Sequence, residues 1–306
     1  MFCVIALIIF AIMGIFSASH RQLAAEAFKC VFKKVTFRPC DTGFRDKMKG
    51  KMVGALLRRS TFAAKVFNNH FELLSWLFFI LMVGSTVWVI RGGYNFYYYG
   101  SCNGLNDSGF CAFDPSGGNN KVSSLDDATC SAVKPSEANL TLKDVDLSLF
   151  QIKQASTTNT LVFIGCYSCD YTRKAYPIIQ DLLKKKPINY IFAHFPVKSY
   201  AEYLTGVGVC AYSEDKNKFW RLNDALFAST KEQIADPLFV DGLLSDIGYD
   251  PSKIKTCTES AATKATVETM RSEIKKTGIY GTPLIFINGT PLVGPKPARV
   301  YENMLR

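Results

Sequence analysis

Histidine is scarce in this sequence, which has three among 306 residues: His20, His70 and His194. The ten cysteines include one close pair, Cys166-Tyr-Ser-Cys169. Structural zinc sites need four ligands at characteristic spacing, and no second Cys/Cys or Cys/His pair has the spacing of a zinc ribbon. A zinc site at the close pair is therefore disfavoured, and copper held by this pair with His194 stays as an alternative.

Charge is absent from two long stretches, residues 1–19 and 73–90. A helix rises ~1.5 Å per residue, so each stretch covers most of a hydrocarbon core about 30 Å thick. Trp76 and Trp88 lie near the ends of the second stretch, where aromatic side chains suit the membrane–water interface. We therefore expect two transmembrane helices, residues 1–19 and 71–92.

Acidic residues are scarce between these stretches. Residues 17–70 hold twelve Lys or Arg but three Asp or Glu, a net charge of +9, which leaves +1 of the total +10 for the rest of the chain. A nucleic-acid-binding domain would spread such charge over its folded face, so we expect no nucleic-acid partner. Positively charged loops stay in the cytoplasm.

This charge pattern predicts a two-pass protein of the cell membrane, with the lipid bilayer as a partner. The loop of residues 20–70 is then cytoplasmic, and the N-terminus and the catalytic domain are extracytoplasmic. The alternative is a cleaved signal peptide over residues 1–19, although a basic segment before the apolar run is missing.

Residues 93–143 are rich in turn signals and predict an extracytoplasmic linker. The linker holds Cys102, Cys111 and Cys130. Disulfides persist outside the cytoplasm and help segments that have little apolar core. Three cysteines cannot all pair with one another, so their pairing stays open.

A regular pattern covers residues 144–306. Residues 160–196 predict a strand, a turn with the cysteine pair, a helix and a second strand, and residues 198–276 are mostly helical. Asn288-Gly289 is a hairpin signal between two short strands. The expected elements are strands at 160–164, 188–195, 283–287 and 291–293, and helices at 170–186 and 298–306. The predicted fold is α/β, with an inserted helical subdomain.

The cysteine pair lies where a strand enters a helix, and this position suits redox chemistry. The free N–H groups and dipole at the helix N-terminus stabilise a thiolate at Cys166, which makes it the nucleophile. Cys169 is close enough to resolve a mixed disulfide formed at Cys166. A purely structural disulfide is the alternative.

Gly281-Thr282-Pro283 directly precedes a strand. In a redox protein of this kind we expect Pro283 to be cis, with the Thr282 backbone beside the two sulfurs. The Thr282 N–H and C=O would then bind an extended substrate as an added strand. The alternative is an ordinary trans proline that opens a strand.

Taken together, these residues resemble the thioredoxin-fold family, and within it the DsbA-like branch. The resemblance covers about half of the chain and rests on the order of its motifs. These are the Cys166–Cys169 unit, Phe195-Pro196, Lys218-Phe-Trp220, Gly281-Thr282-Pro283, Phe286-Ile-Asn-Gly289 and Gly294.

The resemblance implies a membrane-anchored protein thiol–disulfide oxidoreductase that acts on extracytoplasmic client proteins. Oxidation of clients is favoured over isomerisation or reduction, and no cofactor is expected beyond the two cysteines. A membrane redox partner of the DsbB or vitamin K epoxide reductase (VKOR) type would recycle it. The alternative is a tethered module on the same fold that handles metal or binds clients without catalysis.

The sequence departs from the family between the two cysteines. Strongly oxidising members have Pro-His there, whereas this chain has Tyr167-Ser168, which supplies no cationic partner. We therefore expect a less favoured thiolate and a less oxidising disulfide than in those members.

Cys210 and Cys257 both lie in the helical insert. We expect a structural disulfide between them that ties two of its helices together. The alternative is two buried free thiols, because cysteine packs well as a small apolar residue.

Overall fold

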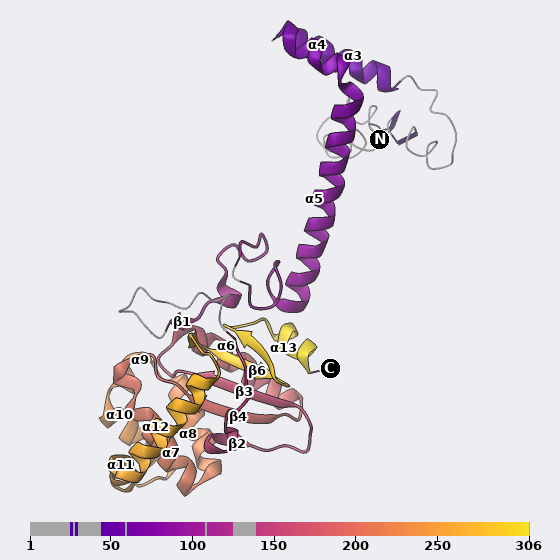
Figure 1. Cartoon of the computed structure of the whole chain (residues 1–306). Coiled ribbons are helices and arrows are strands. Elements are labelled where there is room, and N and C mark those ends of the chain that lie inside the picture. The colour runs from indigo at the N-terminus through magenta and orange to yellow at the C-terminus, as the bar shows by residue number, and fades with distance from the viewer. Residues whose placement is uncertain are drawn as a thin grey trace. The chain divides into compact units, whose positions relative to one another are not determined.

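The computed structural model describes residues 44–124, except 59 and 108, and residues 139–305, together with residues 25, 26, 28 and 29. The chain divides into two compact units, Met1–Ile90 and Arg91–Arg306, whose helices and strands are labelled in Figure 1. The expected span over residues 1–19 lies outside the described residues, as does Cys130.

The described part of the first unit is helical. It contains α3 (Phe44–Leu57), α4 (Thr61–Asn69) and most of α5 (Phe71–Tyr99). Ser60 caps α4, because its hydroxyl accepts a hydrogen bond from the Ala63 N–H at 3.3 Å. No helix in the described part of the chain is both long and apolar enough to cross a membrane. The expected span over residues 71–92 forms part of α5, and its role as a membrane span is therefore not confirmed.

The second unit combines one larger sheet with helices on both of its sides. Its strands are β1 (Ser123–Ser124), β2 (Gln151–Lys153), β3 (Thr160–Gly165), β4 (Asn189–His194), β5 (Gly281–Thr282), β6 (Leu284–Ile287) and β7 (Thr290–Val293). Its α-helices after α5 are α6 (Asp170–Lys185), α7 (Tyr203–Glu214), α8 (Lys216–Ala228), α9 (Lys231–Ala235), α10 (Pro237–Ile247), α11 (Pro251–Glu259), α12 (Ala261–Lys276) and α13 (Ala298–Met304). Among the described residues, short 3-10 helices form at η1 (Gly118–Asn120), η2 (Leu147–Leu149) and η3 (Ser199–Ala201).

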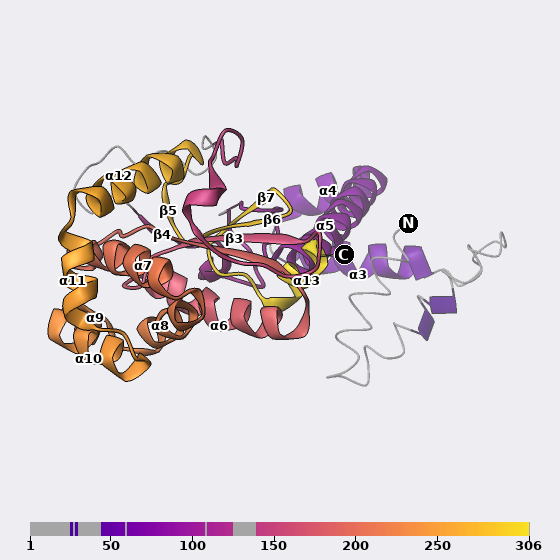
Figure 2. The same cartoon turned by 90° about the horizontal axis from the view of Figure 1, so that it is seen from below.

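The larger sheet has the strand order β2-β4-β3-β6-β7. β3 and β4 are parallel, and the other neighbouring pairs are antiparallel. Helix α6 makes the crossover between the two parallel strands. In Figure 2 this helix lies on one side of the sheet and α12 lies on the other.

The apolar runs predicted as strands are buried on both faces of the sheet. Leu161 and Phe163 of β3 pack into the core that contains α6, while Val162 and Ile164 pack into the core that contains α12. Successive strand side chains point to opposite faces, so a strand covered on both sides is apolar throughout. The predicted α/β fold with a helical insert is confirmed.

Asp236-Pro237 and Asp250-Pro251 mark two helix starts in the helical insert. Asp236 and Asp250 accept hydrogen bonds from backbone N–H groups of the first turns of α10 and α11, and a proline begins each helix. The predicted disulfide between Cys210 and Cys257 is present and joins α7 to α11.

The described part of the segment that we expected to be a linker folds onto the sheet. Cys102 and Cys111 form a disulfide. Within the loop that this disulfide closes, the Asn106 side chain binds the edge strand β7, donating to the Pro291 carbonyl and accepting from the Val293 N–H, both at 2.7 Å. Residues 91–124 therefore belong to the same compact unit as the sheet.

Candidate active site

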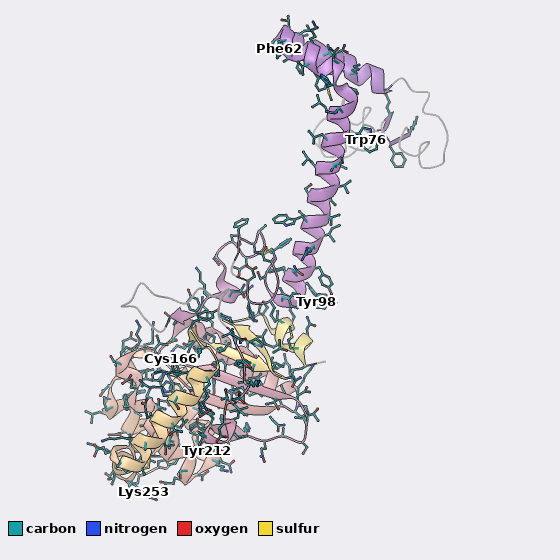
Figure 3. The ribbon with its side chains drawn as sticks, viewed as in Figure 1. Phe62, Trp76, Tyr98, Cys166, Tyr212 and Lys253 are labelled. Carbon is teal, nitrogen blue, oxygen red and sulfur yellow. A yellow bond between two sulfur atoms is a disulfide. The ribbon has the colours of Figure 1, made fainter. Side chains whose placement is uncertain are left out.

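The cysteine pair lies at the junction between β3 and α6, inside the second unit (Figure 3). Cys166 follows the last residue of β3, and Cys169 is the N-cap residue of α6. The Cys169 N–H donates to the Cys166 carbonyl at 3.2 Å, which closes the turn. Both thiols are free and buried, with exposed fractions of 0% and 3%.

A close approach between β3 and α6 sets the entry to this turn. A Cβ atom at Gly165 would lie 2.6 Å from Thr172 Cγ2. The absence of a side chain at position 165 therefore leaves room for the Thr172 side chain. The Thr172 hydroxyl in turn accepts a hydrogen bond from the Cys166 N–H at 3.4 Å. Glycine therefore precedes the first cysteine for a packing reason.

Two polar groups lie within hydrogen-bond distance of the Cys166 sulfur. The Ser168 hydroxyl lies 3.0 Å from it, and the Val197 N–H points to it at 3.5 Å. A hydrogen bond from the Cys169 thiol is the largest cause that lowers the pKa of Cys166 well below its usual range, and His194 and Ser168 act in the same direction. The same bond and burial raise the pKa of Cys169. Cys166 is therefore the thiolate and Cys169 the protonated partner.

His194, the expected partner of the cysteine pair in a copper site, is also a cause of the lowered pKa of Cys166. The dipeptide between the cysteines supplies no cation, but the charge of His194, from the neighbouring strand β4, contributes to lowering the pKa of Cys166. The parallel register of β3 and β4 places Gly165 opposite His194, so the histidine ends its strand beside the start of the cysteine turn. The buried His194 ring is held through Nδ1, 2.8 Å from the Thr205 hydroxyl.

The dipeptide between the cysteines has two separate roles. Ser168 contacts the sulfur, whereas Tyr167 is fully buried, with its ring centroid 4.5 Å from that of His194. The Tyr167 hydroxyl donates to Asn223 Oδ1 at 2.8 Å, and Arg173 Nε donates to the Tyr167 carbonyl at 2.6 Å. These contacts fix the conformation of the turn, and no local sequence pattern marks Asn223 or Arg173 as part of it.

The Thr282–Pro283 peptide bond is cis, as expected. Both residues are buried, and the edge that we expected an extended substrate to use is occupied by the chain itself. Ser123 and Ser124 of β1 pair antiparallel with Thr282 and Gly281. The Ser123 hydroxyl lies beside the Cys169 thiol and opposes the rise in the pKa of that thiol.

Residues 155–305 match the family model described as Thioredoxin. This part of the chain is a thioredoxin-like domain. A search of curated proteins finds no match. Within the described residues, no group of three or more His, Cys, Asp or Glu side chains in or around the thioredoxin domain is arranged to hold a metal ion.

Several solved structures are similar to this thioredoxin domain. The thiol-disulfide exchange protein α-DsbA2 from Wolbachia pipientis has 20% identity and a TM-score of 0.44, over 50% of this chain and 83% of that one. BdbD from Bacillus subtilis has 17% identity and a TM-score of 0.45, over 53% and 91%. The catalytic domain of Proteus mirabilis ScsC has 21% identity and a TM-score of 0.46, over 54% and 93%.

Proposed function

We propose that the thioredoxin domain is a protein thiol–disulfide oxidoreductase of the DsbA type that oxidises client proteins. The observation that carries this proposal is the Cys166 sulfur, which lies 3.0 Å from the Ser168 hydroxyl and accepts the Val197 N–H at 3.5 Å, while the charge of His194 lowers its pKa. A thiol with a low pKa is a good leaving group, so a stabilised Cys166 thiolate favours the transfer of a disulfide to the client.

The reaction takes place in two exchange steps. A client thiolate attacks Cys166 Sγ in the oxidised domain, the Cys166–Cys169 bond breaks, and Cys169 leaves and takes up a proton. A second client thiolate then attacks the client sulfur of the mixed disulfide and expels Cys166 as a thiolate. The client gains a disulfide and the domain keeps two electrons, which a membrane partner of the DsbB or VKOR type would remove.

Turnover of a reduced peptide by the full-length chain tests this function. We expect the oxidised protein to convert a dithiol peptide to its disulfide, and the Cys166→Ala variant to do so at the uncatalysed rate. A Cys210→Ser/Cys257→Ser variant controls for the structural disulfide and retains the exchange reaction if it folds. Equal rates for the wild type and Cys166→Ala would reject the proposal.

We also propose that the chain is anchored in the cell membrane, with the thioredoxin domain and its clients on the extracytoplasmic side. The charge-free residues 73–90 and the basic residues 17–70 support this orientation. Apolar side chains along α5 are exposed, among them Ile80 at 62% and Trp88 at 69%. The described chain does not cover these apolar side chains, and contact with lipid would remove them from water.

Membrane association and protease protection test the anchor. The full-length chain is expected to stay with membranes after alkaline extraction, and external protease is expected to digest the thioredoxin domain while sparing residues 20–70. Release of the intact chain by alkaline extraction, or digestion of residues 20–70 in sealed cells, would contradict this topology.

A further inference from the structure

Strand β1 lies on the edge that an extended client would use. Its two residues pair antiparallel with β5, Ser123 with Thr282 and Ser124 with Gly281. Thr282 directly precedes the cis Pro283 and is completely buried. An extended peptide can add to a sheet edge only where the backbone groups are free, so β1 and a client compete for the same backbone.

Two glycines let this segment approach closely. A Cβ atom at Gly281 would lie 2.5 Å from Val122 Cγ2 and 2.7 Å from the Ser123 carbonyl oxygen. A Cβ atom at Gly294 would lie 2.6 Å from the Lys121 carbonyl oxygen. These distances are too short for any side chain, so residues 121–123 are packed directly against the backbone around Pro283.

The residues before β1 hold it in place. The Asn120 side chain accepts a hydrogen bond from the buried Lys296 ammonium and donates to the Asp107 carbonyl at 2.5 Å. Asn119 donates to the Gly100 carbonyl at 2.9 Å. The segment is therefore anchored at η1, while β1 itself is held by pairing over two residues, and such a short ladder has little net strength.

We propose that residues 122–124 are an internal, unreactive occupant of the client-binding edge, which must leave before an extended client pairs with Thr282. This inference rests on the proposed exchange function. A serine at position 123 lies beside Cys169 but cannot form a disulfide. A client thiol can form one with Cys166, and the mixed disulfide gives the client an attachment that β1 lacks.

Exchange rates with two matched peptides test the proposal in the full-length, oxidised chain. One is an extended peptide with a single cysteine, and the other has N-methyl groups beside the cysteine, so that it cannot donate ladder hydrogen bonds. The Ser123→Pro/Ser124→Pro variant removes both backbone N–H groups from β1. The Ser123→Thr/Ser124→Thr variant keeps them and serves as the control.

We expect the proline variant to exchange about tenfold or more faster with the first peptide and to change little with the second. The threonine variant is expected to match the wild type. Asn120→Ala, which loosens the anchor without altering β1, is expected to give a smaller increase in the same direction and covers the case in which the proline variant does not fold.

The outcomes separate the two proposals. If all variants exchange with the first peptide at the wild-type rate, β1 does not compete with clients and this inference fails, while the exchange function stands. If the wild type and every variant exchange with neither peptide, the exchange function itself fails.

The position of β1 has a test of its own. A Ser123→Cys substitution in a Cys166→Ala chain places a thiol beside Cys169, and oxidised glutathione is expected to join the two sulfurs. A matched Ser116→Cys substitution, before η1, is expected to leave Cys169 free. Absence of the new disulfide would show that β1 does not occupy this edge in solution.

Discussion

Besides the Cys169 thiol, which has the largest effect on the pKa of Cys166, three other groups stabilise its sulfur. Ser168 belongs to the cysteine turn, the Val197 N–H follows β4, and His194 ends β4. In this thioredoxin domain the histidine therefore acts from a neighbouring strand instead of from the dipeptide between the cysteines. The histidine can act from β4 because the parallel register of β3 and β4 sets His194 opposite Gly165, directly before Cys166.

Replacing His194 with glutamine is expected to make the Cys166 thiolate harder to form. The change removes a charge that lowers the pKa of Cys166, so the midpoint of thiolate formation should rise by about one to three pH units. The ultraviolet absorbance of the thiolate, followed against pH in the reduced protein, measures the midpoint.

Tyr190→Phe is the matched control for this experiment. Tyr190 also lies in β4 and is buried, but it is not among the groups that shift the pKa of Cys166. The control should leave the midpoint unchanged. An unchanged midpoint in His194→Gln as well would show that the histidine does not support the thiolate.

The residue types at the site could be predicted from the sequence, but their contacts could not. Cys166, Cys169 and Pro283 follow from local patterns, namely a strand-to-helix junction and a Thr-Pro before a strand. The role of His194 depends on which strand lies beside which and in what register. The dipeptide alone therefore gives an incomplete account of what surrounds the Cys166 thiolate, and the expected weaker oxidising power stays a prediction.

Close packing between helices of the insert is set by small residues. In α7, a Cβ atom at Gly206 would lie 2.7 Å from Thr258 Cγ2 of α11, near the Cys210–Cys257 disulfide. A Cβ atom at Gly208 in the same helix would lie 3.6 Å from Phe219 Cε2, an ordinary contact. A side chain therefore fits at position 208 but not at position 206.

Alanine at these two positions is expected to have different effects on stability. Gly206→Ala crowds a stiff β-branched side chain and should lower the free energy of unfolding by roughly 1–3 kcal/mol. Gly208→Ala should leave it unchanged or raise it by up to about 1 kcal/mol, because alanine favours a helix. Urea denaturation with the disulfides intact measures both, and equal losses would contradict the packing argument.

At the level of elements, the sequence predicts most of the sheet and the insert. Buried strands are short apolar runs, and Asp-Pro marks the starts of α10 and α11. Strand β1 could not be predicted, because two serines in a turn-rich stretch carry no strand signal. Its pairing with β5 depends on a contact between segments far apart in the chain.

At the level of the whole molecule, the charge-free stretches and the basic segment lie in the first compact unit, up to Ile90, and the thioredoxin domain lies in the second. The division into two compact units falls at Ile90–Arg91, within α5, close to the end of the second charge-free stretch. The stretch that looked like a linker instead folds onto the domain and supplies the strand beside its cysteines. Low regularity in a sequence predicts loops, but it does not predict where those loops pack.

The central claim is that Cys166 is the sulfur that exchanges with clients, and a mixed-disulfide trap tests it most directly. In a reduced Cys169→Ala chain, the Cys166 thiolate attacks a disulfide-containing peptide, releases one peptide thiol and stays joined to the other sulfur. Mass spectrometry is expected to find the adduct on Cys166, and the reduced Cys166→Ala chain is expected to give none. An adduct of equal yield on Cys169 in Cys166→Ala, or no adduct in Cys169→Ala, would contradict the account.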